Sequence, residues 1–141
     1  EIWVKLWGNL SFNPISALTQ MTLQEICRFA PTRGLAAAMM AEAQAVAEKL
    51  GVRFRITLEQ RLAGAEAVGA HKTSMLQDVQ AGRAPELAAL VGAVLELAAI
   101  TGTPAPHIAA VHATMQGLAH KLAAAGAALE PRPLVNRAGA G

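Results

Sequence analysis

Glycine and proline residues divide this 141-residue chain into segments of helical length. Gly51 and Gly102 follow long runs of helix-forming residues, where a glycine commonly ends a helix. Pro31, Pro85 and Pro106 stand where the next runs begin, and proline is tolerated in the first turn of a helix. The runs are rich in Ala and Leu, the chain has no Tyr, and such a composition favours helix over sheet. We therefore predict an all-α fold of about six or seven helices.

The spacing of apolar residues and of capping residues gives bounds for these helices. Thr22 and Glu25 form the capping-box pattern, and Pro14 predicts a kink because proline removes an amide donor. The segment Val52–Ile56 alternates apolar and basic residues, but without a partner strand we predict only an extended connector. The predicted helices are Ile2–Leu18, Thr22–Phe29, Pro31–Leu50, Thr57–Val68, Ser74 or Met75 to Ala81, Pro85–Thr101 and Pro106–Ala125.

The length of the chain suits one compact domain and is short for an enzyme that also houses a nucleotide. Periodicity is lost from Gly126, so we predict a helical domain over residues 1–125 and a flexible tail over residues 126–141. The chain has no initiator Met and opens on a helical pattern. We expect it to begin inside a longer polypeptide.

Charge and hydropathy argue against two classes of partner. The net charge is +2, but the 12 cationic residues are scattered and do not interleave with aromatic residues, so we expect no nucleic acid. The longest apolar run, Leu87–Ile100, is shorter than the roughly 20 residues that a bilayer requires, so we expect no membrane span. The single Cys27 cannot form an internal disulfide, and we predict a buried thiol and a reducing cytoplasm.

A polar stripe interrupts the first predicted helix. At about 100° per residue, its members fall within an arc of roughly 80°. A solvated helix face is one interpretation. Asn is a poor residue inside a helix, however, so two on one face favour specific hydrogen bonding. The stripe consists of Lys5, Asn9, Asn13 and Ser16.

Lys5 stands between two tryptophans in the sequence, Trp3 and Trp7. A lysine that is partly desolvated by such neighbours has a lowered pKa, which suits a general acid at neutral pH. Cation–π packing against an indole is the alternative, and it would keep the charge without any chemistry.

A second polar cluster runs from His71 to Glu86. On spacing alone, Ser74 is predicted as the N-cap of the helix that follows it, and Glu86 as a favourable anion in the first turn after Pro85. No metal site is predicted, because His107, His112 and His120 lack the i, i+4 pairing or the nearby carboxylate that zinc sites use.

Two groups of motifs, taken together, resemble the C-terminal domain of ketopantoate reductase (2-dehydropantoate 2-reductase) over roughly Trp3 to Lys121. The resemblance implies a two-domain enzyme of the 6-phosphogluconate-dehydrogenase-like type. Its N-terminal Rossmann domain, absent from this chain, binds NADPH, and the helical domain closes over a 2-keto acid. The motifs are Lys5-Leu6-Trp7-Gly8-Asn9 with Asn13-Pro14-Ile15-Ser16-Ala17-Leu18, and Lys72-Thr73-Ser74-Met75-Leu76-Gln77-Asp78 with Gly82-Arg83 and Glu86.

The resemblance also implies roles for individual residues. Lys5 corresponds to the general acid, and Asn9 and Asn13 to amides that bind the substrate. Ser74 corresponds to the hydroxyl that holds the substrate carboxylate, and Glu86 to a carboxylate that contacts a substrate hydroxyl or the cofactor ribose. We expect the isolated domain to be inactive, because the remainder of the cofactor site lies in the missing domain.

Two alternatives stay open beside reduction of ketopantoate. Residues 87–92 are apolar where family members place polar residues, so the substrate is either ketopantoate or another 2-keto acid. A helical dimerisation module without catalysis, in a homodimer, is the second alternative. Asn13 is the weakest site residue, because about 12 Å of straight helix separates it from Lys5.

Overall fold

The computed structural model describes residues 2–83 and 88–125 of the chain. This part of the chain forms seven helices and no strand, which confirms the predicted all-α fold. The helices are α1 (Ile2–Thr19), α2 (Leu23–Arg28), α3 (Ala30–Lys49), α4 (Leu58–Val68), α5 (Ser74–Gln80), α6 (Ala88–Thr101) and α7 (Pro106–Ala125).

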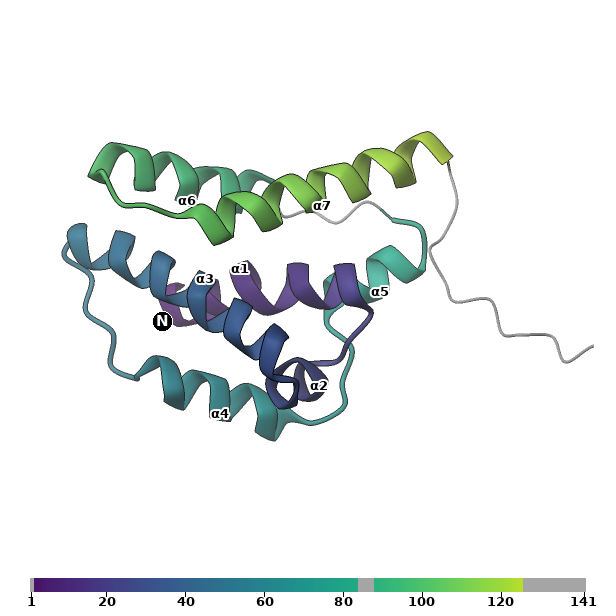
Figure 1. Ribbon diagram of the computed structural model, residues 1–141, viewed down its shortest axis with the longest axis horizontal. Helices are drawn as coiled ribbons and strands as arrows, with labels where there is room; N and C mark the ends of the chain where they lie inside the picture. The colour runs from purple at the N-terminus through teal and green to yellow at the C-terminus, as the bar shows by residue number, and fades with distance from the viewer. Residues whose placement is uncertain (1, 84–87, 126–141) are drawn as a thin grey trace, which may run out of the picture.

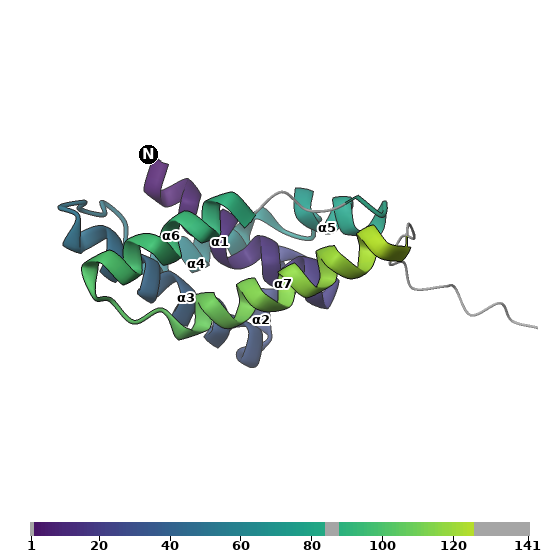
Figure 2. The ribbon, with the colours of Figure 1, turned by 90° about the horizontal axis from the view of Figure 1, so that it is seen from above.

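The helices pack around α1 and α3 (Figure 1). Helices α6 and α7 form a hairpin that covers α1 and α3 on one side, while α2 and α4 lie on the other side. Helix α5 packs mainly against α1. Seen from above, the first turns of α1 and of α5 lie toward the same edge of the molecule, and α2 lies toward the opposite edge (Figure 2).

The ends of several helices follow the predicted local signals. Thr22 and Thr57 each complete a capping box with the residue three positions later. Gly51 and Gly102 adopt φ of 85° and 64°, the left-handed conformation that glycine adopts without a steric penalty. In both cases the next residue donates its N–H to a carbonyl in the last turn, as Val52 does to Ala47 (3.0 Å), which completes a Schellman motif.

Two predictions about the helices need correction or comment. The N-cap of α5 is Thr73, whose hydroxyl accepts from the Leu76 N–H, so the prediction of Ser74 as the cap was wrong by one residue. Pro14 lies inside α1, and the helix continues through it to Thr19. The predicted start of the sixth helix at Pro85, residue Glu86, and the predicted tail over residues 126–141 lie outside the described residues.

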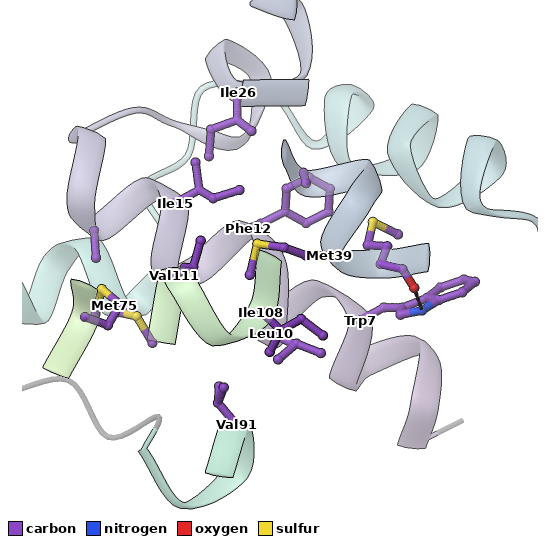
Figure 3. Packing of buried hydrophobic residues seen from close by; sticks show 14 of the residues in the cluster. Trp7, Leu10, Phe12, Ile15, Ile26, Met39, Met75, Val91, Ile108 and Val111 are labelled. Carbon is purple, nitrogen blue, oxygen red and sulfur yellow. Dashed lines mark hydrogen bonds between the residues drawn. The ribbon is translucent and has the colours of Figure 1, made fainter. Parts of the chain in front are cut away.

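One hydrophobic core joins all seven helices (Figure 3). Helix α1 supplies its largest side chains, among them the fully buried Trp7. The indole N–H of Trp7 donates to the Met40 carbonyl (3.0 Å), and its ring stacks on Phe54 with 4.1 Å between centroids. Phe54 belongs to the connector between α3 and α4, so the predicted extended segment is held on the core by its apolar side chains.

The start of α7 is fixed by a carboxylate from α3. Glu42 accepts from the backbone N–H groups of His107 (2.9 Å) and Ile108 (3.0 Å), and from His107 Nδ1 (2.6 Å). These amides are free at a helix N-terminus, where the helix dipole also favours an anion. The prediction that His107 lacks a nearby carboxylate was wrong. Glu42 lies 65 residues away in the sequence, so nothing in the sequence indicated that the fold brings the two together.

Replacing Glu42 with alanine is expected to lower the free energy of unfolding by about 1.5–3 kcal/mol, because charge-assisted hydrogen bonds are lost at the start of α7. Urea denaturation of the 141-residue chain measures it. Glu48, an exposed glutamate on the same helix that accepts only from Gln44, is the control. Glu48→Ala is expected to change stability by no more than about 0.5 kcal/mol. Equal effects of the two substitutions would refute the capping role.

Candidate active site

The polar stripe lies on the face of α1 that turns away from the core side chains Trp7 and Leu10. Exposure falls along the stripe in chain order. Lys5 is exposed, Asn9 and Asn13 are half-buried, and Ser16 is completely buried. The stripe is therefore exposed to solvent at Lys5 and buried beneath α5 at Ser16. This excludes the interpretation of the stripe as a fully solvated helix face.

Lys5 is not enclosed by its two tryptophan neighbours. Trp7 is buried on the other side of α1, engaged with Met40 and Phe54, while Lys5 is exposed. The Trp7 indole therefore does not desolvate the lysine. No hydrogen bond or ion pair within the described chain involves Lys5, so its ammonium group is available to a ligand or to a second domain.

Asn9 and Asn13 form a ladder along the helix. The Asn13 amide nitrogen donates to the Asn9 side-chain oxygen (3.4 Å), as residues four apart on one helix face can do. This contact occupies the acceptor of Asn9 and leaves its Nδ2 group without a partner among the described residues. Asn13 thus orients Asn9, and Asn9 offers donors at the level of the next turn after Lys5.

Ser16 connects the stripe to α5. Its hydroxyl donates to the Asn13 carbonyl (3.3 Å) and is hydrogen-bonded to the hydroxyl of Thr73, the N-cap of α5. Because Ser16 donates to Asn13, Thr73 is the donor in the hydroxyl pair. The sequence placed Ser16 on the polar face but gave no sign of this partner, since 57 residues separate the two hydroxyls.

A second contact holds the other end of α5. Gln80 donates to the side-chain oxygen of Gln20 (3.0 Å) and accepts from Lys72 (2.7 Å). Gln20 directly follows α1 and has φ of 66°, a left-handed conformation that is uncommon for a residue other than glycine. With both ends of α5 fixed on α1, the exposed Ser74, next to Thr73, is held near the buried end of the stripe.

Two further polar groups lie outside the stripe, namely Cys27 of α2 and Arg61 of α4. Burial raises the pKa of the Cys27 thiol, with smaller charge effects from Arg33, Glu66 and Arg61, which fits the predicted structural cysteine. Burial likewise lowers the pKa of Arg61, whose guanidinium carbon lies 5.6 Å from the centroid of Phe12. Arg61 was not predicted as a site residue, because nothing in the sequence around a single arginine on a helix indicates that its side chain is half-buried.

The stripe supplies one cation, Lys5, and neutral donors, while Glu86 lies outside the described residues. Within residues 2–83 and 88–125, no group of three His, Cys, Asp or Glu side chains could hold a metal ion. Such a site can stabilise negative charge on a small oxygen-rich molecule and supply a proton to it.

Comparison with known proteins gives the family. A model described as "Ketopantoate reductase PanE/ApbA C terminal" matches residues 1–119. The chain belongs to this family. It is 59% identical to a 2-dehydropantoate 2-reductase of Mesorhizobium japonicum over 119 residues, which are 84% of the chain and 36% of that relative. It is 30% identical to the 2-dehydropantoate 2-reductase of Archaeoglobus fulgidus over 68% of the chain and 32% of that relative.

The fold agrees with membership of the ketopantoate reductase family. The crystal structure of 2-dehydropantoate 2-reductase from Methylococcus capsulatus superposes with a TM-score of 0.77 at 30% identity, over 85% of this chain and 39% of that one. The chain spans about a third of the length of the curated relatives it matches. None of the helices in the described residues is long and apolar enough to cross a membrane.

Proposed function

We propose that this chain is the substrate-side domain of an NADPH-dependent 2-dehydropantoate 2-reductase, which reduces ketopantoate to pantoate in pantothenate and coenzyme A synthesis. The observation that carries the proposal is the polar stripe itself. A family member at 59% identity bears that name, and here a lysine with no partner among the described residues and an oriented asparagine lie one turn apart on α1.

The described residues contain no strand, and therefore no strand–loop–helix cradle for a dinucleotide pyrophosphate. NADPH would be held mainly by a domain outside this chain, and when bound it would supply hydride to the keto carbon. Of this chain, the Glu86 carboxylate is the one group that we assign to the cofactor ribose or to a substrate hydroxyl.

The chain's own residues would bind the substrate and supply the proton. Reduction of a ketone builds negative charge on its oxygen, and a cation and oriented donors stabilise that charge most in the transition state. Lys5 would donate the proton to this oxygen, and the free amide hydrogens of Asn9 would hold it in place. Asn13 would act through Asn9, and the Ser74 hydroxyl would hold the carboxylate end.

A different 2-keto acid as substrate is the runner-up within the same reaction class, because the residues that follow Glu86 in the sequence are apolar. Both candidate substrates would use the same stripe, and they would differ at the Glu86 end of the site. A homodimer and a cytoplasmic location are predictions of the same proposal.

The complete polypeptide that contains this chain is expected to oxidise NADPH when ketopantoate is added, as followed by absorbance of the reduced nicotinamide. Among 2-keto acids of increasing size, kcat/KM is expected to be highest for ketopantoate. The 141-residue chain alone is expected to give no turnover. Absence of turnover with every 2-keto acid, in a folded complete polypeptide, would refute the proposal.

A further inference from the structure

Arg61 of α4 reaches across to α1, and nothing in the described chain neutralises it. The guanidinium packs over Phe12, and Arg61 Nε is completely buried with no hydrogen-bond partner. The two carboxylates of α4 face other arginines: Glu59 pairs with Arg33 (3.3 Å) and Glu66 with Arg28 (3.2 Å). A buried donor without a partner is costly, and a half-buried cation without an anion more so.

Gly8 provides the space that this guanidinium fills. An ideal Cβ at position 8 would lie 3.4 Å from Arg61 Cζ and would overlap Nη2. Glycine in the interior of a helix costs roughly 0.5–1 kcal/mol relative to alanine. Close approach of a charged side chain is a physical reason for glycine at this position.

Gly8, the position that Arg61 approaches, lies three residues after Lys5 on α1. Residues three apart on a helix share a face, with Cβ positions about 5–6 Å from each other, so Arg61 approaches α1 one turn from Lys5. Within the described chain the terminal nitrogens of Arg61 make no hydrogen bond, and they are not completely buried as Nε is. Within residues 2–83 and 88–125, Lys5 and Arg61 thus both lack a carboxylate partner, and Arg61 meets α1 within one helical turn of Lys5.

We propose that Arg61 and Lys5 form an oxyanion subsite at the exposed end of the stripe, and that Gly8 keeps it open. The ligand is a carboxylate or phosphate group, which a planar guanidinium binds through two parallel hydrogen bonds. It comes either from the 2-keto acid or from the dinucleotide. The inference rests on the proposed function for the source of the anion, and on the geometry of Arg61 for its existence.

The test uses the complete polypeptide and four variants. Arg61→Met keeps apolar packing over Phe12 and removes the charge. Arg61→Lys keeps the charge but loses the planar guanidinium that can make two parallel hydrogen bonds. Gly8→Ala displaces only the end of a flexible side chain, so it is expected to preserve stability. Arg28→Met, which removes an exposed arginine on α2, is the control.

Binding of oxalate and of inorganic phosphate, measured by calorimetry, is expected to weaken about 10- to 100-fold in Arg61→Met and in Gly8→Ala, and to be unchanged in Arg28→Met. Arg61→Lys is expected to lie between wild type and Arg61→Met. A substrate source predicts a raised KM for the 2-keto acid with an unchanged Kd for NADPH. If the anion belongs to the cofactor, the Kd for NADPH is expected to rise while the KM for the 2-keto acid stays unchanged.

Unchanged anion binding, KM and Kd in both Arg61→Met and Gly8→Ala would overturn the inference and make Arg61 a structural cation on Phe12. That result would leave the proposed function intact if wild type still turns over. Conversely, a wild type that reduces no 2-keto acid but binds either anion in an Arg61-dependent way would refute the proposed function and support the subsite.

Discussion

Replacing Lys5 with alanine is expected to lower kcat of the complete polypeptide by about 10²- to 10⁴-fold, the usual contribution of a positioned general acid. The substitution should not unfold the domain, because Lys5 is exposed and makes no hydrogen bond or ion pair within the described chain. Steady-state kinetics with NADPH and ketopantoate measure kcat, and circular dichroism checks the fold.

Two controls separate proton transfer from simple charge. Lys5→Arg keeps a cation that does not release its proton near neutral pH, so kcat is expected to stay low while KM changes little. Lys49→Ala removes an exposed lysine at the end of α3, bonded only to the Thr101 carbonyl, and should leave kcat unchanged. Near-normal turnover in Lys5→Ala, or full recovery in Lys5→Arg, would contradict the general-acid role.

Replacing Trp7 with alanine is expected to destabilise the domain by about 3–5 kcal/mol, the range for a large buried aromatic residue. The substitution leaves a large cavity in the core, removes the stacking on Phe54 and leaves the Met40 carbonyl without the indole N–H. Urea denaturation of the 141-residue chain should show a lower midpoint, and the thermal midpoint should fall by roughly 10 °C or more.

The second tryptophan of the chain is the matched control. Trp3 is half-buried near the start of the same helix, and Trp3→Ala should cost about 1 kcal/mol or less. The loss of stability in Trp7→Phe should lie between those of Trp3→Ala and Trp7→Ala, since phenylalanine keeps an aromatic ring against Phe54 but loses the hydrogen bond to Met40. A loss of stability in Trp3→Ala as large as in Trp7→Ala would contradict the special contribution of the buried Trp7.

Local signals were sufficient for most of the fold. The capping boxes at Thr22 and Thr57 and the glycines at positions 51 and 102 set helix ends through contacts within a few residues, and such contacts can be recognised in sequence. The error at Ser74 has the same origin: Thr73 and Ser74 are equivalent as caps in sequence, and the buried Ser16 decides between them by bonding Thr73.

Contacts between distant residues were not predictable in this way. Glu42 at the start of α7, Ser16 with Thr73, and Arg61 over Gly8 each depend on how two helices cross. The sequence showed a polar face on α1 and, through the family resemblance, which residues on it to examine. It could not show that Asn13 turns toward Asn9, or that Trp7 is buried while Lys5 is exposed.

Helix α1 carries the core on one face and the polar stripe on the other. Side-chain ends lie about 5–6 Å from a helix axis, so a rotation of α1 by roughly 10° moves Asn9 by about 1 Å. A displacement of that size is enough to lower a rate by about 100-fold. The catalytic rate would therefore depend on how the core packs. Substitutions around Trp7 and Ile15 that preserve stability should still change turnover. Compensating substitutions in the core should restore turnover with no change to a polar residue.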